Sequence, residues 1–177
     1  MTLNDVILVD ESDNQLGTMD KMDAHRQALL HRAISVFIFN SKGEWLLQQR
    51  AKNKYHSNSL WTNTSCTHPY PNESIDQAAH RRLLEEMGMQ CPLTRKFSFV
   101  YKEQLDNELT EFEFDHVFFG FSDKLPEINE EEVWDYKYMN YPDLQKDVEH
   151  HPDNYTVWFK KITAQVYQHL QSATSKQ

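Results

Sequence analysis

Three carboxylates alternate with other residue types between positions 111 and 115. Glu111, Glu113 and Asp115 are separated by single aromatic residues. In a β-strand, side chains two residues apart point to the same face, so the three carboxylates would lie together. Facing water, they form an ordinary solvated surface; facing the core, they repel one another and lose hydration. A bound metal ion would reconcile their charge with burial.

Three histidines could supply further metal ligands. His25, His31 and His68 lie near predicted strand ends or within a long loop, and histidine is the commonest transition-metal ligand. The alternative for each is an ordinary surface or hydrogen-bonded histidine. The remaining histidines have no comparable context: His56, His80, His116, His150, His151 and His169.

Two cysteines are present, and they have different surroundings. Cys66 lies in a polar segment, two residues before His68. It is a candidate acid–base or nucleophilic thiol, because a nearby cation or metal favours the thiolate; the alternative is an inert buried cysteine. Cys91 precedes a proline, and we expect a structural role for it.

Basic residues are scattered but could converge on an anion. In the segment HRRLLEEMGM, Arg81 precedes Glu85 by four residues, and Arg82 precedes Glu86 by the same interval. Such spacing is also typical of surface ion pairs on a helix. Further bases occur at Lys21, Arg50 and Lys54, which ordinarily would be solvated.

Composition limits the possible partners. The chain has 177 residues, 18 Lys and Arg, 27 Asp and Glu, and a net charge of −9. This charge disfavours a broad nucleic-acid interface, so an anionic ligand needs a local basic cluster. With 39% hydrophobic residues the chain can build a core. Two cysteines, no signal-peptide pattern and no long apolar run predict a cytoplasmic protein without a membrane partner.

The elements that must position these residues follow from periodicity. β-branched and aromatic residues or alternation predict strands at Asp5–Asp10, His31–Asn40, Glu44–Gln49, Lys96–Gln104, Leu109–Phe121 and Val133–Met139. Met19–Leu30 has helical or irregular character. The segment from Ala51 to Pro71 is predicted to be a long irregular loop, and loops of this length are usually functional. The acidic run Glu130–Glu132 is expected at a solvated loop end.

One helix is predicted with clear boundaries, from Ser74 to Met87. Its apolar stripe has a four-residue spacing, Ser74 can cap its start, and Gly88 suits its end. A closing helix is expected over Tyr155–Leu170. Together these elements predict a single α+β domain over residues 1–177, with mixed β-sheets flanked by α-helices and a flexible tail from Ser172 to Gln177.

Several separated motifs together resemble the type I isopentenyl diphosphate isomerases of the Nudix-fold superfamily. They are GTMDKMDAH, HRAISVFIFN, LLQQRAKNK, LWTNTSCTHP, ESIDQAAHRRLLEEMGM, FVY, EFEFDHVF, EEVWDYKYM and YTVWF. Each motif is weak alone, but their order and spacing agree from about Val6 to about Leu170. The resemblance implies a Nudix fold.

The helix is similar to the Nudix box, with two departures. Five residues match characteristic positions of this motif: Glu73, Arg81, Glu85, Glu86 and Gly88. Thr67 replaces the opening glycine, and Arg82 replaces a glutamate with which Nudix hydrolases collect magnesium. A cation at this position disfavours diphosphate hydrolysis and suits diphosphate retention. The interval between His25 and His31 is also one residue short of the family pattern, which predicts displacement of the segment Asp20–Leu30.

The resemblance implies a set of ligands for metals and substrate. One divalent ion, Mn²⁺, Mg²⁺ or Zn²⁺, would be bound by His25, His31, His68, Glu111 and Glu113. A Mg²⁺ ion accompanying the substrate diphosphate would be held by Glu86 and the backbone carbonyl of Cys66. The diphosphate oxygens would be contacted by Lys21, Arg50, Lys54 and Arg82.

The reaction that the resemblance implies is a reversible 1,3-allylic proton shift between isopentenyl and dimethylallyl diphosphate. Glu113, assisted by Tyr101, would handle one proton and Cys66 the other, on opposite faces of the substrate. Trp158 would cover the carbocation with its π face; a tryptophan in the core is the alternative and is compatible with that role. The expected partner is this small diphosphate, and the protein is expected to be a monomer or weak homodimer.

Two other functions remain open at this stage. A Nudix hydrolase of another diphosphate compound is the first, and Arg82 and Cys66 argue against it. A non-enzymatic binding module is the second, but it would have no reason to assemble three histidines, two glutamates and a thiol. Metal analysis and a substrate assay separate these possibilities.

Overall fold

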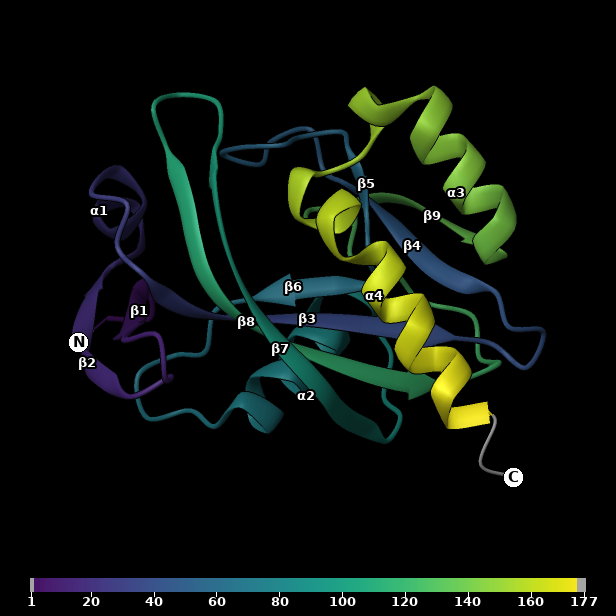
Figure 1. The fold of residues 1–177 in the computed structure, drawn as a ribbon, viewed down its shortest axis with the longest axis horizontal. Coiled ribbons are helices and arrows are strands. Elements are labelled where there is room, and N and C mark those ends of the chain that lie inside the picture. The colour runs from purple at the N-terminus through teal and green to yellow at the C-terminus, as the bar shows by residue number, and fades with distance from the viewer. Residues whose placement is uncertain (1, 175–177) are drawn as a thin grey trace.

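The computed structural model describes residues 2–174. Its strands are β1 Asp5–Val9, β2 Gln15–Asp20, β3 His31–Phe39, β4 Trp45–Arg50, β5 Trp61–Thr62, β6 Ser65–Thr67, β7 Leu93–Gln104, β8 Thr110–Phe121 and β9 Val133–Met139. Its helices are α1 Lys21–Arg26, α2 Ile75–Met87, α3 Tyr141–His150 and α4 Val157–Thr174, with a short 3-10 helix at Pro152–Asn154. This arrangement is the α+β class with a mixed sheet (Figure 1).

Strand β3 organises the sheet. Along one edge it pairs in parallel with β8, from His31 opposite Glu113 to Phe39 opposite Phe121. Its other edge is shared among three antiparallel partners: β1 at residue 31, β6 at residues 34–36 and β4 at residues 38–39. Because β6 and β8 pair with opposite edges of β3, side chains of these two strands lie on either side of the same β3 residues.

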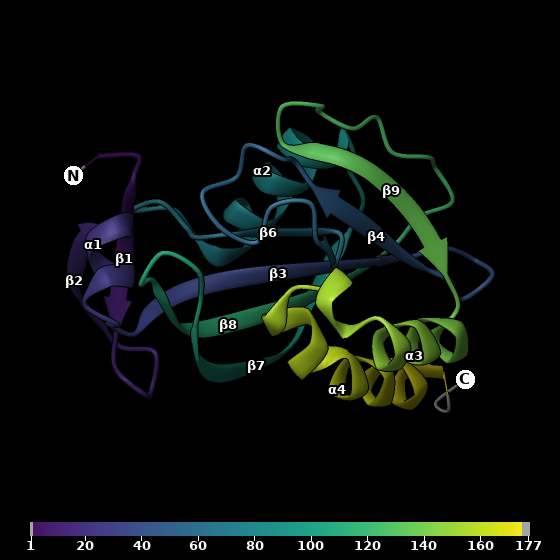
Figure 2. The same cartoon turned by 90° about the horizontal axis from the view of Figure 1, so that it is seen from above.

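Helices cover the two faces of the central strands. Figure 2 shows α2 on one side of β3 and β8, and α3 and α4 on the other. The period-two alternation of β3 separates two cores: Ile34, Val36 and Ile38 pack with α2. On the opposite face, Phe37 and Phe39 pack with residues of α4.

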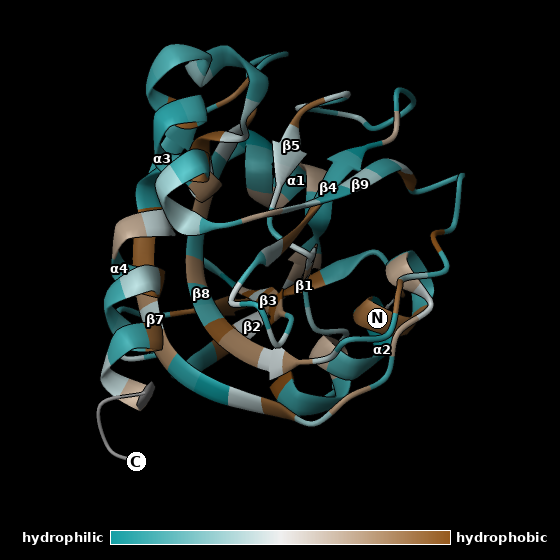
Figure 3. Cartoon of the chain, turned by 90° about the vertical axis from the view of Figure 1, so that its right-hand side faces the viewer, coloured by the Kyte–Doolittle hydropathy of each residue, from teal (hydrophilic) through white to brown (hydrophobic). Residues whose placement is uncertain are grey.

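The alternation of β8 buries its carboxylates. Phe112 and Phe114 pack against a small cluster formed by Ile7, Val9 and Leu30. The intervening residues face the other way, and Glu111, Glu113 and Asp115 are only 4%, 6% and 2% exposed. The solvated-surface alternative for these three carboxylates is therefore wrong. Brown, hydrophobic segments lie along parts of β7 and β8, whereas α3 is largely hydrophilic (Figure 3).

Helix α2 has the predicted caps. The Ser74 hydroxyl accepts a hydrogen bond from the backbone N–H of Gln77, and the Gln77 side chain reaches back to the backbone N–H of Ser74. This reciprocal capping box satisfies two free donors at the helix start. Gly88 ends the helix with a φ of +61°, and a Cβ there would lie 2.5 Å from the carbonyl oxygen of Glu127. Both the conformation and the space therefore require glycine.

Four elements differ from the expectation. Gln15–Asp20 is a strand, β2, although none of its residues is buried and the segment carries little hydrophobic signal. The segment from Ala51 to Pro71 contains the short strands β5 and β6 and so is not wholly irregular. Helix α3 was not expected, since Leu144 is its one buried residue.

The closing helix also has different ends. It begins at Val157, after the 3-10 helix, and continues through Thr174. Residues 172–174 of the expected flexible tail thus belong to α4, and residues 175–177 lie outside the described part of the chain. Among the residues that the structure describes, no helix has the length and apolar character needed to cross a bilayer.

Candidate active site and metal centre

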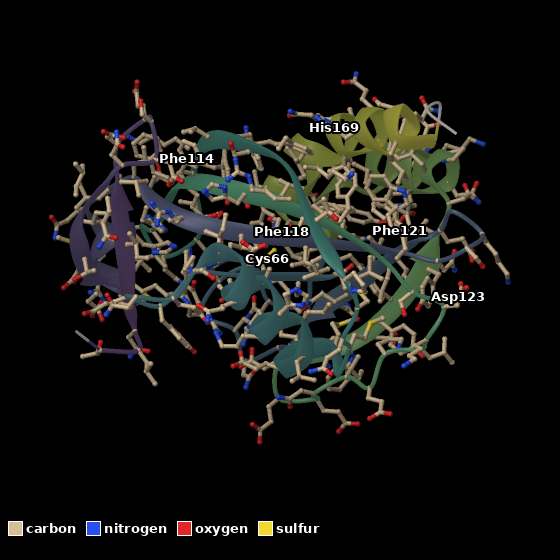
Figure 4. The ribbon with its side chains drawn as sticks, turned by 90° about the horizontal axis from the view of Figure 1, so that it is seen from below. Cys66, Phe114, Phe118, Phe121, Asp123 and His169 are labelled. Atoms are coloured by element: carbon tan, nitrogen blue, oxygen red, sulfur yellow. The ribbon has the colours of Figure 1, made fainter. Side chains whose placement is uncertain are left out.

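A cavity of about 460 Å³ brings together side chains from distant parts of the sequence. Its lining includes Cys66 from β6, Glu113 from β8 and Trp158 from α4. The four predicted diphosphate contacts also line it: Lys21, Arg50, Lys54 and Arg82. Figure 4 places Cys66 near the centre of the molecule, beside the central strands. Thus an acidic protein has a local basic cluster next to a thiol and buried carboxylates.

Three histidines and one carboxylate converge beside this cavity, and two of the four, His68 and Glu113, line it. One ligand atom from each of His25, His31, His68 and Glu113 lies within 4.8 Å of the others. His68 Nε2 is 2.9 Å from Glu113 Oε1, and His31 Nε2 is 3.6 Å from the same oxygen. The short interval between His25 and His31 does not separate them, since their ring centroids are 4.9 Å apart.

The tautomers of two of these histidines suit a metal ion. Nδ1 of His25 donates to the carbonyl oxygen of Lys21 at 2.7 Å, and Nδ1 of His31 donates to that of Leu29 at 2.8 Å. A carbonyl can only accept, so the Nε2 atom of each ring carries a lone pair. Both Nε2 atoms are buried without a hydrogen-bond partner. Such orphaned lone pairs, facing a carboxylate, fit a divalent cation.

Two of the histidine rings, His25 and His68, favour the neutral, ligating form. Burial lowers the pKa of His25, and the neighbouring His31 lowers it further. Burial lowers the pKa of His68 to about 3, although Glu113 acts in the opposite direction. Neutral imidazoles are the form that binds metals.

Tyr101 links the two glutamates. Its hydroxyl oxygen lies 2.8 Å from Oε2 of Glu111 and 2.8 Å from Oε2 of Glu113. Burial raises the pKa of Glu111 well above its usual value, and the nearby Glu113 adds to this effect. Burial also acts to raise the pKa of Glu113, but the adjacent His31 and His68 rings outweigh it and lower that pKa. The two carboxyls therefore differ sharply in proton affinity.

Glu111 lies beside a histidine that sequence reasoning missed. A ligand atom from each of His25, His56 and Glu111 lies within 4.8 Å of the others. Glu111 does not belong to the four-residue group around Glu113 in the described chain. The sequence offered no spacing signal for His56, which is 4% exposed in the loop after β4. Burial and the Arg50 cation lower the pKa of His56 to about 2.

Cys66 is held as a thiol. Its Sγ donates a hydrogen bond to Oδ1 of Asn63 at 3.2 Å and lies 3.8 Å from Oγ of Ser35. Although Cys66 keeps partial exposure to the cavity, burial of its sulfur raises its pKa to about 12, and the charge of Asp115 adds to this effect. Burial and the Asp115 charge thus outweigh the nearby Arg50 cation, and Cys66 is a thiol that can give a proton.

Cys66 also lies on a strand and not on a loop. It pairs with Ser35 in the antiparallel ladder between β6 and β3. Ser35 donates a 2.6 Å hydrogen bond to Asp115, whose pKa burial raises well above its usual value. Three central strands therefore fix the position of the thiol.

Trp158 belongs both to the core and to the cavity. It is 4% exposed and packs in the cluster that includes Phe159. Its ring faces the cavity, where the guanidinium of Arg50 lies 5.4 Å from the ring centroid. The core alternative and the cation-facing role are thus compatible.

The basic residues are partly desolvated and only partly paired. Burial, together with the neighbouring cations Arg82, Arg50 and Lys54, lowers the pKa of Lys21 to about 8. The Nε atom of Arg50 is buried without a hydrogen-bond partner. Mutual repulsion and an unused donor favour an anion between these groups.

Glu132 corrects another expectation. It was expected at a solvated loop end, but its carboxylate forms ion pairs with Lys54 and with Arg82 Nη2, the latter at 2.8 Å. These contacts lower its pKa despite its partial burial. Glu132 therefore neutralises part of the basic cluster, in the place that an anionic ligand could take.

Glu86 is buried and has no free oxygen. It is 3% exposed; Oε1 lies 2.5 Å from Arg82 Nε, and Oε2 accepts a 2.7 Å hydrogen bond from Gln48. The Arg82–Glu86 pair is therefore more than a surface pair. The magnesium role of Glu86 with the Cys66 carbonyl stays a prediction, and it requires one of these contacts to be released.

Comparisons with known proteins agree with the motifs. The NUDIX domain family model matches residues 29–159. Over 177 residues the chain is 48% identical to isopentenyl-diphosphate Delta-isomerase of Pectobacterium atrosepticum, covering 100% of this chain and 99% of that protein. Isopentenyl-diphosphate Delta-isomerase 2 of Photorhabdus laumondii is 53% identical over 157 residues, covering 89% of each chain.

The fold has a solved counterpart as well. A crystal structure of a Deinococcus radiodurans protein superposes with a TM-score of 0.78 at 18% identity, covering 92% of this chain and 99% of the other. That likeness concerns the fold alone, whereas the match to the Pectobacterium protein covers the whole of this chain. The chain belongs to the NUDIX family and, within it, to the isopentenyl-diphosphate Delta-isomerases.

Proposed function

We propose that this protein interconverts isopentenyl diphosphate and dimethylallyl diphosphate through the cavity beside β3, β6 and β8. The observation that carries the proposal is a single cavity lined by a protonated thiol, Cys66, a buried carboxyl, Glu113, and four basic side chains. These groups supply proton transfer and diphosphate binding in one place.

The basic cluster would bind the diphosphate. Lys21, Arg50, Lys54 and Arg82 all line the cavity. Arg50 offers its unused Nε donor, and the substrate would compete with Glu132 for Lys54 and Arg82. Charge-assisted hydrogen bonds to phosphate oxygens are among the stronger polar contacts. Binding would thus exchange an internal carboxylate for the diphosphate.

One divalent ion, Mn²⁺, Mg²⁺ or Zn²⁺, would be held by the histidines and glutamates beside the cavity. Its ligands would be His25, His31, His68, Glu111 and Glu113. When bound, the ion would increase the acidity of the proton on a coordinated carboxyl. A separate Mg²⁺ would accompany the diphosphate at Glu86 and the backbone carbonyl of Cys66.

Two protein groups would exchange protons with the substrate. In the forward direction, a proton added to the terminal methylene carbon leaves a tertiary carbocation, and loss of a proton from the carbon two bonds away forms the new double bond. Glu113, hydrogen-bonded to Tyr101, would handle one proton and Cys66 the other. Their order depends on the direction of the reaction, and positioned acid–base groups of this kind contribute ~10²–10⁴-fold each.

The carbocation must be shielded from water until it loses a proton. The indole of Trp158 lines the cavity and would face the cation, an attraction of ~2 kcal/mol when desolvated. Diphosphate hydrolysis is disfavoured because Arg82, and not a carboxylate, follows Arg81 in the box and is paired with Glu86. The positive charge at this position of α2 therefore favours retention of the intact diphosphate.

The proposal also covers the setting of the protein. We expect it to act in the cytoplasm as a monomer or weak homodimer, with a small-molecule diphosphate as its partner. Its two free cysteines suit a reducing compartment, and its net charge of −9 disfavours nucleic acid. Sedimentation at several concentrations measures the oligomeric state.

The deciding experiment follows isopentenyl diphosphate by NMR in D₂O, with purified protein and added Mn²⁺ or Zn²⁺ together with Mg²⁺. We expect dimethylallyl diphosphate carrying deuterium, with no phosphate released. Release of phosphate without rearrangement would establish hydrolysis and contradict the proposal.

A further inference from the structure

We propose that His56 is an additional direct ligand of the divalent ion, binding through Nε2 beside Glu111, so that the centre has four imidazole nitrogens. This inference rests on the metal centre of the proposed function, and it extends the predicted set of five ligands by one residue.

The imidazole of His56 is held in a fixed place. It is 4% exposed and lies edge-on to the rings of Tyr55 and Trp158, with centroid distances of 4.3 and 5.9 Å. Its backbone carbonyl accepts a 3.3 Å hydrogen bond from Nη2 of Arg50. A ring packed in this way loses little conformational freedom when it binds an ion.

The ring presents Nε2 to Glu111. Nδ1 of His56 is 3.1 Å from the hydroxyl oxygen of Ser57. In the ligating tautomer Nδ1 carries the proton and donates this hydrogen bond to Ser57. The Nε2 lone pair then faces Oε1 of Glu111 at 3.5 Å. The other oxygen of Glu111 is engaged by Tyr101, so Oε1 remains available to an ion.

The 3.5 Å distance is slightly longer than the separation of two ligands on one ion and closer to it than to a hydrogen bond. It exceeds the ~2.7–3.2 Å range of a good N–H···O hydrogen bond. Two donors ~2.1 Å from a metal and at 90–110° to each other are separated by about 3.0–3.4 Å. His31 Nε2 and Glu113 Oε1 show nearly the same gap, 3.6 Å, at the other side of the site.

One ion, and not two, accounts for the arrangement. His25 belongs both to the group with His56 and Glu111 and to the group with His31, His68 and Glu113. The Nε2 atom of His25 is a buried, unpartnered donor that can serve only one cation. The donors of one six-coordinate ion lie within about 4.2 Å of one another. A single ion beside His25 would therefore draw the two groups together into one coordination sphere with six protein donors.

A sixth donor of this type alters the preference for metals. Imidazole suits Zn²⁺ and related transition metals, whereas Mg²⁺ prefers carboxylate, carbonyl and water oxygens. Four nitrogens beside two carboxylates should thus favour Zn²⁺ or Co²⁺ over Mg²⁺. Removing His56 should weaken transition-metal binding more than Mg²⁺ binding.

The test measures metal affinity of the purified full chain after removal of bound metal, by competition with a chelator for Zn²⁺. We expect His56→Ala and His56→Asn to weaken Zn²⁺ binding by at least ~10-fold, the scale on which metal sites respond even to loss of a supporting residue. His80→Ala, an exposed residue of α2, is the matched control and should bind as the parent does.

Pulsed electron paramagnetic resonance of the Mn²⁺-loaded protein gives a second readout, independent of activity and of variant stability. The parent should show four coordinated imidazole nitrogens, and His56→Ala three. His68→Ala distinguishes the metal centre of the proposed function from the added role of His56. Loss of metal in His68→Ala supports the centre, whatever His56 does. If His68→Ala loses metal while the parent shows three nitrogens and His56→Ala keeps full affinity, the role of His56 is refuted and the centre stands. If neither variant changes affinity, the centre is refuted as well.

Discussion

The Sγ atom of Cys66 donates a 3.2 Å hydrogen bond to Oδ1 of Asn63, and the same oxygen accepts a 3.3 Å hydrogen bond from Nε1 of Trp158. Asn63 is fully buried, and its amide nitrogen donates to the backbone carbonyl of Val36 on β3. One amide therefore positions both the thiol and the indole relative to the central strand.

This position leads to the first prediction, for Cys66. Cys66→Ser and Cys66→Ala should lose at least ~100-fold in kcat, the usual scale for a positioned acid–base group. A serine hydroxyl has the same hydrogen-bond partners but a far higher pKa, so it exchanges protons poorly. Cys91→Ser is the control for loss of a thiol. Near-parental turnover by Cys66→Ser, measured with isopentenyl diphosphate, would remove Cys66 from proton transfer.

Metal content and turnover should separate at Glu113. His68→Ala deletes a donor 2.9 Å from Glu113 and should lose metal and activity together. Glu113→Gln keeps an oxygen ligand but lacks the exchangeable carboxyl proton, so it should lose activity even where metal remains. Elemental analysis beside the isomerase assay checks both variants. Full metal content in a His25/His31/His68 triple alanine variant would rule out the centre.

Arg82 should contribute to substrate binding through its charge. Arg82→Glu would place a third carboxylate beside Glu86 and Glu132 and repel the diphosphate. Two like charges at contact distance repel by about 4 kcal/mol at an intermediate dielectric. After rearrangement we expect a loss of roughly tenfold to a few hundredfold in kcat/KM, at about 1.4 kcal/mol per decade.

Arg82→Gln is the matched variant, and it should lose less, because it removes attraction without adding repulsion. Steady-state kinetics with isopentenyl diphosphate measures both variants. Parental kcat/KM in both would mean that Arg82 only pairs with Glu86, and the argument against hydrolysis would lose its main support.

Acid should destabilise the metal-free protein. A histidine in the unfolded chain has a pKa near 6.5, whereas burial lowers the pKa of His56 to about 2 and that of His68 to about 3 in the fold. At a pH between the folded and unfolded pKa values of each histidine, the unfolded state binds one more proton at that histidine than the folded state does. The free energy of unfolding should therefore fall as pH decreases below about 6.5, by ~1.4 kcal/mol per pH unit for each histidine.

Urea denaturation in the presence of a chelator, at pH 7.5, 6.0 and 5.0, measures this slope. His68→Gln should make the pH dependence shallower by about one proton. A parent protein whose stability is unchanged over this range would show that these histidines are not held neutral.

Local patterns predicted the elements with strong periodicity. Strand β9 has the predicted bounds, and α2 has the predicted caps at Ser74 and Gly88. The alternation from Glu111 to Asp115 correctly placed three carboxylates on one face. It could not decide between water and the core, because that depends on the helix that covers the sheet.

The missed elements depend on tertiary contacts. Strand β6 has three residues, and its pairing with β3 gives it a regular conformation. Helix α3 buries only Leu144, so it lacks an apolar stripe; the cap Asn140 and the following Pro142 were the signals that could have located it.

The site was predicted incompletely for the same reason. His25, His31, His68 and Glu113 lie together as expected, although their places in the sequence are far apart. His56 and Glu132 were missed, since a histidine or a glutamate in a polar loop carries no local sign of burial. Their positions are determined by Trp158 and by the cations Lys54 and Arg82.

The shared edge of β3 has a consequence for how the chain is held together. The ligands come from four parts of the chain: α1, β3, β8 and the residue that follows β6. They meet near the point on β3 where its pairing with β1 ends and its pairing with β6 begins. An ion bound there acts as a cross-link between four parts of the chain, and it closes loops that the sheet alone closes only by hydrogen bonds. Amide hydrogen exchange in α1 and in the segment 51–68 should therefore slow on metal addition far more than exchange in α3, which contributes no ligand.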